Sequence, residues 1–158
     1  MEEPKGLYQH LSKTAKEVLK TAQGLVGEDN LEYVGTEHVL MAILEHGLGL
    51  GAQVLDNCGL TLEEVKDRVA TLHKKSLSET WVFGRLPGTP HFKQVIAYAL
   101  EEAEKAKDQK VGTEYLLLGI LREKDCVAER TLKDLGVTLS IAQKEVARLQ
   151  DRPVWPMK

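Results

Sequence analysis

Apolar side chains recur every three or four residues along most of the chain, and glycine-containing polar stretches separate the blocks. This spacing places the apolar side chains of each block on one face of an α-helix, and no segment shows the alternation of a half-buried strand. The pattern therefore predicts an all-α fold. Ser12 is expected to cap a first helix and Thr36 a second, largely buried helix. A short third helix follows to Asn57, and a fourth starts at the capping box of Thr61 and ends near Lys74.

The whole helical pattern occurs twice. V-G-T-E-H-V-L at 34–40 returns as V-G-T-E-Y-L-L at 111–117, which is an offset of 77 residues from Gly35 to Gly112. A self-match that keeps one register over roughly 58 positions indicates a duplicated unit. We therefore predict two tandem four-helix repeats in a pseudo-two-fold arrangement, with Thr113 and Thr138 capping the later helices of the second. The predicted segments are repeat one at 11–74, a linker at 75–88, repeat two at 89–151 and a tail at 152–158.

Charge and composition mainly exclude classes of function. The 158-residue chain has a net charge of −3 with both signs interspersed, so it presents no basic surface for nucleic acid or an anionic membrane. The charged run at 101–108 is expected to be a solvated helical face. No apolar run is long enough to span a membrane, and the acidic start at 1–5 has no secretory pattern. We expect a cytoplasmic monomer.

Common catalytic and metal-binding motifs are absent. Cys58 and Cys126 form no C-x-x-C pair and are expected to be reduced thiols that pack as small apolar residues. His38 and His46 could share a helix face but have no third ligand, so no metal site is predicted. The chain also lacks phosphate-binding glycine loops, the zinc-protease motif and the nucleophile elbow. The sequence predicts a protein without enzymatic activity or a cofactor.

The repeated Thr-Glu pair, at 36–37 and 113–114, is the remaining candidate for chemistry and has two interpretations. In the first, the threonine caps a helix and the glutamate offsets its dipole, each contributing about 0.5–1 kcal/mol. In the second, the carboxylates bind an arginine-like guanidinium, and hydroxyl and N–H groups near Ser12 and Thr89 receive an anion. Composition alone favours the first interpretation.

The chain resembles the N-terminal domain of the Clp/Hsp100 unfoldases, particularly the ClpC type, which is a double Clp-N repeat. The resemblance covers about 11–150 and rests on V-G-T-E-H-V-L-M-A-I-L, on V-G-T-E-Y-L-L-L-G-I-L and on the Thr-Pro opening of the second repeat. It implies two pseudo-symmetric four-helix repeats that dock adaptor and substrate proteins for an ATP-driven unfoldase. It implies no catalysis by the domain itself.

The resemblance also implies a pocket for phosphorylated arginine, in which a glutamate meets the guanidinium and helix-start donors meet the phosphate. The positions that match the family motif, together with the paired threonines, are Ser12, Thr36, Glu37, Thr89, Thr113 and Glu114. Thr14 and His91 stand where the family usually has arginine. His38 becomes Tyr115 in the second repeat, so the two candidate pockets differ.

Two functions follow from this resemblance. Because only seven residues follow Asp151, we expect a free-standing Clp-N protein that acts in trans on a Clp machine, competes for adaptors or hands over substrates. The alternative is a structural accessory that docks on the Clp core or the unfoldase ring without binding substrate. Its expected contacts are the aromatic residues of the linker and tail, Trp81, Phe83 and Trp155.

Overall fold

The computed structural model describes residues 9–28, 35–80, 90–124 and 126–150, and within them the fold is all-α, as predicted. The helices are α2 (Lys13–Glu28), α3 (Thr36–His46), α4 (Leu50–Asn57), α5 (Leu62–Thr80), α6 (Pro90–Lys105), α7 (Thr113–Arg122), α8 (Val127–Asp134) and α9 (Leu139–Leu149). The described residues contain no strand, and the one isolated bridge in them joins Leu11 to Val111. No single helix in these ranges has the length and hydropathy of a membrane span; α3 and α4 pass that test only as a pair, bent by 88°.

The offset found in the sequence is kept by the fold. Helices α6, α7, α8 and α9 begin 77 residues after α2, α3, α4 and α5, respectively. Gly59 and Gly136 occupy the left-handed region, with φ of 86° and 91°, after the short helices α4 and α8. The predicted capping box is confirmed, because the Glu64 N–H donates to Thr61 Oγ1 at 3.1 Å and the Thr61 N–H donates to Glu64 Oε1 at 3.2 Å. Helix α5 extends beyond the predicted end, through residues 75–80.

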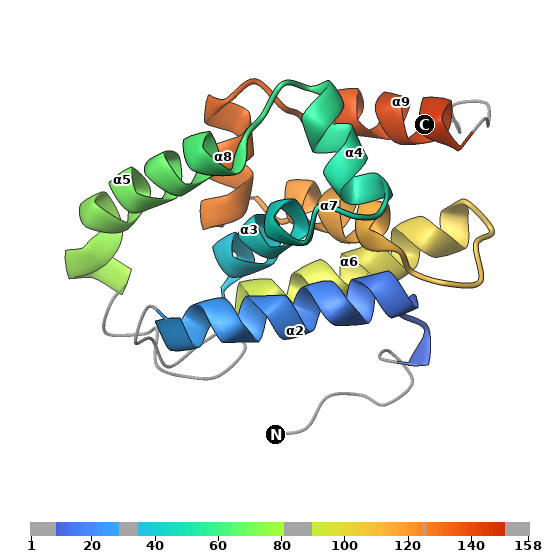
Figure 1. The fold of residues 1–158 in the computed structure, drawn as a ribbon, viewed down its shortest axis with the longest axis horizontal. Coiled ribbons are helices and arrows are strands. Elements are labelled where there is room, and N and C mark those ends of the chain that lie inside the picture. The colour runs from blue at the N-terminus through green and yellow to red at the C-terminus, as the bar shows by residue number, and fades with distance from the viewer. Residues whose placement is uncertain (1–8, 29–34, 81–89, 125, 151–158) are drawn as a thin grey trace.

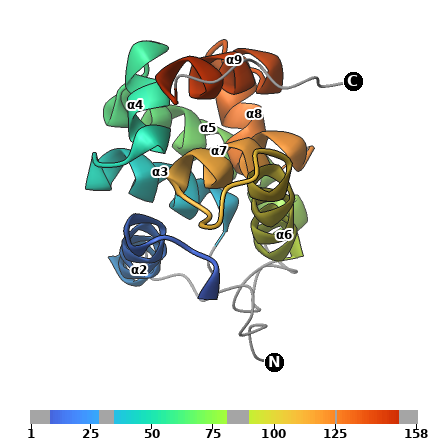
Figure 2. The ribbon, with the colours of Figure 1, turned by 90° about the vertical axis from the view of Figure 1, so that its right-hand side faces the viewer.

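The two repeats share one hydrophobic core. Helices α3 and α7 lie in the middle of the molecule, between α2 and α6 on one side and α4, α8 and α9 on the other (Figure 1; Figure 2). Packing crosses the repeat boundary, because α4 contacts α7 and α9, and α5 contacts α8. Burying both central helices removes a large apolar area from water, at about 25 cal/mol per Å². The boundary between the two sequence repeats therefore does not separate independent hydrophobic cores.

The cysteines agree with the prediction. Both thiols are free; Cys58 is half-buried and Cys126 is buried. Cys126 is also the N-cap of α8, where its sulfur accepts the N–H of Glu129 at 3.4 Å. Burial raises the pKa of both thiols, so both favour the protonated form at neutral pH.

Candidate functional site

Each G-T-E motif starts a buried helix, but its threonine is not the N-cap. Gly35 and Gly112 are the N-caps of α3 and α7, with extended backbones at φ of −104° and −87°. The prediction that Thr36 and Thr113 cap their own helices is therefore wrong. Each threonine is already the first helical residue, and its hydroxyl makes a hydrogen bond elsewhere.

The two threonines cap helices of the opposite repeat. Thr113 Oγ1 accepts the N–H of Gly51 at 2.8 Å, at the start of α4. Thr36 Oγ1 accepts the N–H of Ala128 at 3.2 Å, at the start of α8. First-turn N–H groups have no partner within their own helix, so each hydroxyl satisfies a buried donor. These reciprocal bonds join the repeats at their centre.

The two glutamates fold back against the glycine of their own motif. Glu37 is 3% exposed and Glu114 is 7% exposed. A Cβ atom built on Gly35 or Gly112 would lie 2.4 Å from the Oε1 of the following glutamate, so a larger residue at either glycine would displace the carboxylate. Both carboxylates thus lie at the positive end of a helix, which agrees with the helix-start interpretation.

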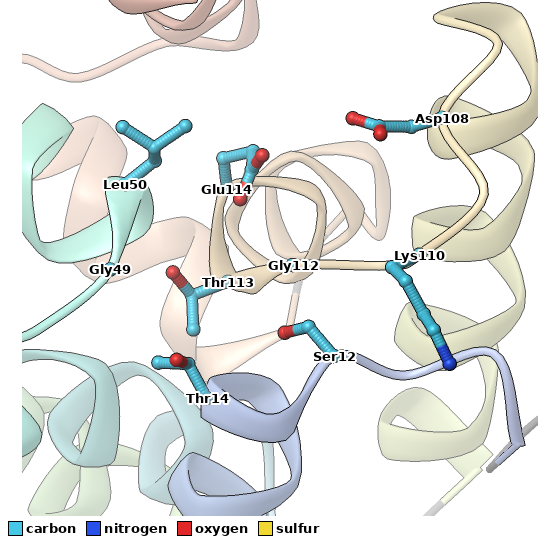
Figure 3. Close-up of a pocket in the computed structure, with 9 residues that line it drawn as sticks. All are labelled: Ser12, Thr14, Gly49, Leu50, Asp108, Lys110, Gly112, Thr113 and Glu114. Atoms are coloured by element: carbon cyan, nitrogen blue, oxygen red, sulfur yellow. The ribbon is translucent and has the colours of Figure 1, made fainter.

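Glu114 also lines a pocket of about 240 Å³ in which both repeats meet (Figure 3). The start of α2, the start of α7, and the loops before α4 and α7 enclose it. Its lining residues are Ser12, Thr14, Gly49, Leu50, Asp108, Lys110, Gly112, Thr113 and Glu114. The Ser12 N–H donates to the Val111 carbonyl at 2.9 Å, and this bond fixes the start of α2 beside the start of α7.

The structure therefore places Ser12 in the same pocket as the glutamate of the other repeat. Thr14 and Thr113 lie in the same pocket, whereas Thr36 and Glu37 are not among its lining residues. Thr89, Trp81, Phe83 and Trp155 lie outside the described residues. His91 is described, and its Nδ1 lies 2.5 Å from the Glu123 Oε2.

The pocket has two chemically different sides. Ser12 caps α2 by accepting the N–H of Ala15 at 3.0 Å, so the positive end of that helix faces the pocket. Asp108 and Glu114 supply carboxylates on the opposite side (Figure 3). The arrangement can bind a group that has a cation and an anion close together. Within the described part of the chain, no three His, Cys, Asp or Glu side chains are placed to bind a metal ion.

A half-buried hydrogen-bond network positions the two carboxylates. Tyr115 donates its hydroxyl to Asp108 Oδ2 at 2.7 Å. Gln150 Nε2 donates to Glu114 Oε2 at 2.7 Å and to the Tyr115 oxygen at 3.3 Å. Burial, followed by the bond to Asp108, raises the pKa of the Tyr115 hydroxyl, so it remains a donor at neutral pH. Asp108 and Gln150 were not predicted as site residues, because neither belongs to the repeated motif.

Comparison with known proteins identifies relatives across almost the whole chain. The family model of the Clp repeat (R) N-terminal domain matches residues 10–135 and 88–153. The negative regulator of genetic competence ClpC/MecB of Bacillus subtilis is 34% identical, in an alignment that covers 90% of this chain and 17% of that protein. A chloroplastic ClpA homolog, CD4B of Solanum lycopersicum, is 32% identical over 92% of this chain and 16% of its own length. The chain thus spans about one sixth of these relatives.

Solved structures share the fold at lower identity. The N-terminal domain of the caseinolytic protease associated chaperone ClpD from Arabidopsis thaliana has a TM-score of 0.73 at 17% identity. That comparison covers 90% of this chain and 99% of the ClpD domain. A ClpV N-domain in complex with a VipB peptide has a TM-score of 0.69 at 19% identity, over 97% of this chain and 95% of that domain.

Proposed function

Because the chain belongs to the Clp repeat (R) N-terminal domain family, we propose that it is a non-enzymatic recognition module that binds adaptor or substrate proteins for a Clp-type unfoldase or protease. Clp N-domains are modules of Clp/Hsp100 unfoldases involved in adaptor and substrate interaction, and the ClpV N-domain has been solved with a VipB peptide. The proposal includes a cytoplasmic, monomeric protein acting on a Clp machine.

The Glu114 pocket is the proposed binding site, and its ligand is an arginine-type side chain, including phosphoarginine. One observation carries this proposal: Ser12 and Glu114, from different repeats, line a single pocket. The carboxylate suits a guanidinium, and the α2 start suits a phosphate. The volume of about 240 Å³ is below that of a drug-sized ligand site and matches a single side chain.

Calorimetry with a short phosphoarginine peptide tests the proposal. Glu114→Gln should weaken binding by about tenfold or more, because a charge-assisted hydrogen bond contributes about 1.5–3 kcal/mol. Glu63→Gln is the matched control, since Glu63 is exposed on α5 and lies outside the pocket. Undetectable binding of this peptide by the unmodified protein would refute phosphoarginine as the ligand. Equal affinities of Glu114→Gln and Glu63→Gln would show that Glu114 does not contact it.

Glu37 is proposed as the corresponding residue of a second site. Residues 29–34 and 81–89, which include Thr89, are not described, so this proposal rests on the repeated motif alone. Glu37→Gln added to Glu114→Gln should then abolish the binding that remains in the single variant. If the double variant bound the peptide as tightly as Glu114→Gln alone, the protein would have one site.

A further inference from the structure

We propose that Asp108 is a second guanidinium-binding residue of the Glu114 pocket and that it shifts the preference of the pocket toward unphosphorylated arginine. This inference rests on the proposed function, since it concerns the ligand of the same pocket. The proposed function describes a site that binds the guanidinium of phosphoarginine through one glutamate, whereas this inference adds a second carboxylate.

The backbone at the end of α6 directs Asp108 into the pocket. Lys107 adopts the left-handed conformation, with φ of 60°, which non-glycine residues rarely adopt. Its N–H donates to the Glu104 carbonyl at 3.0 Å, and the Asp108 N–H donates to the Ala103 carbonyl at 2.9 Å, as in a Schellman motif. The chain reverses there, and the Asp108 carboxylate points toward Glu114 (Figure 3).

Separate hydrogen bonds orient the two carboxylates toward one space. Tyr115 binds one Asp108 oxygen, and Gln150 binds one Glu114 oxygen. A guanidinium has five N–H donors in a planar fork, so it can engage two carboxylates at once. A pair fixed in this way suits a planar cation better than one flexible acid would.

The charge of the pocket favours a cation over a phosphorylated side chain. Its lining carries two carboxylates and one ammonium, that of Lys110. The Lys110 Nζ lies 3.4 Å from the Gln9 carbonyl and points away from both carboxylates (Figure 3). Thr14, on the side of the α2 start, is neutral. A phosphate carries about −1.5 to −2 charge near pH 7, so Asp108 disfavours it while attracting the guanidinium.

The sequence position of this second carboxylate differs between the two repeats. Leu31, His38 and His73 stand 77 residues before Asp108, Tyr115 and Gln150. The residue equivalent to Asp108 is thus a leucine, so this carboxylate is not repeated in the sequence. The repeats have therefore diverged at the position that would set ligand charge.

Two peptides that differ only in one arginine, unmodified or phosphorylated, test the inference by calorimetry. Asp108→Asn should weaken binding of the unmodified peptide by about tenfold and change binding of the phosphorylated peptide by less than about threefold. Asp134→Asn removes an equal charge from an exposed residue outside the pocket and should change neither affinity. Tyr115→Phe removes the hydroxyl that donates to Asp108 and accepts from Gln150, and it should shift the affinity ratio in the same direction as Asp108→Asn.

The outcomes separate this inference from the function on which it rests. If Asp108→Asn weakens neither peptide, or both equally, Asp108 has no role in selectivity, while the Glu114→Gln result can still stand. If the unmodified protein binds neither peptide, the pocket proposal falls and this inference falls with it. Circular dichroism of each variant should match the unmodified protein, and a folded Asp108→Asn variant with an unchanged affinity ratio overturns the inference.

Discussion

Each residue of the G-T-E motif has a separate structural role. Gly35 and Gly112 leave space for a folded-back carboxylate, because a Cβ atom there would overlap Oε1 of the next glutamate. Thr36 and Thr113 satisfy donors of the opposite repeat. The motif would therefore be required for folding even without a ligand. Its glutamate in the second repeat also lines the pocket that contains Ser12.

Removing one crossed cap should destabilise the protein measurably. Thr113→Ala leaves the buried Gly51 N–H without its acceptor, and the free energy of unfolding should fall by about 1–2 kcal/mol. Thr113→Ser keeps the hydroxyl and should retain most of the stability. Urea unfolding followed by circular dichroism measures both variants. Equal losses in the two variants would assign the effect to the methyl group and contradict the role of the cap.

The two cysteines should differ in reactivity. Burial raises the pKa of both thiols, with nearby carboxylates adding to the effect, so the reactive thiolate is scarce at pH 8 and increases as the pH rises toward 9. Cys126 is 2% exposed, whereas Cys58 is half-buried. We expect iodoacetamide to modify Cys58 at least about tenfold faster than Cys126 at pH 8, as read by mass spectrometry. Urea should remove the difference, and equal rates in the native protein would contradict the burial of Cys126.

The contact between helices α6 and α7 shows why the prediction from the charge pattern at 101–108 was wrong. The run at 101–108 was predicted to be a solvated face, but Glu102 is fully buried. Arg122 of α7 donates to Glu102 Oε2 at 3.0 Å and lies 4.2 Å from the ring centroid of Tyr98. Helical spacing identifies which residues share a face, but the partner on the next helix depends on tertiary packing. The sequence alone could not supply that partner.

Two glycines in helices should respond oppositely to alanine. A Cβ on Gly119 would lie 2.5 Å from the Val95 carbonyl oxygen of α6, so Gly119→Ala must separate the helices and should cost at least about 2 kcal/mol. Gly24 on α2 has nothing within 4 Å of a built Cβ, and Gly24→Ala should stabilise by about 0.5–1 kcal/mol. Thermal unfolding of both variants provides the measurement. A stable Gly119→Ala protein would contradict the close approach of α6 and α7.

For the whole molecule, the sequence predicted the helices and their duplication but not how the repeats combine. Local signals such as Ser12 and Thr138 identified helix starts correctly, because a cap acts within a few residues of the chain. The meeting of Ser12 with Glu114 depends on packing between repeats, which a self-alignment cannot show. The same limit explains why Thr36 and Thr113 were assigned to their own helices. The duplicated sequence specifies the units, and the shared core determines the site.

A shared core also predicts that both repeats unfold together. Ile43 of α3 and Ile120 of α7 are equivalent and fully buried in one cluster. Ile43→Val and Ile120→Val should each lower stability by about 0.5–1.5 kcal/mol, with one thermal transition that shifts by a few degrees.

Hydrogen exchange can locate that loss within the protein. In either isoleucine variant, the slowest-exchanging amides of α3 and α7 should lose protection by the same free energy, because opening one central helix exposes the other. If Ile43→Val lowered protection only in α2 to α5, the repeats would be separate folding units. The crossed threonine caps would then contribute little to stability, and the pocket between Ser12 and Glu114 could open without unfolding either repeat.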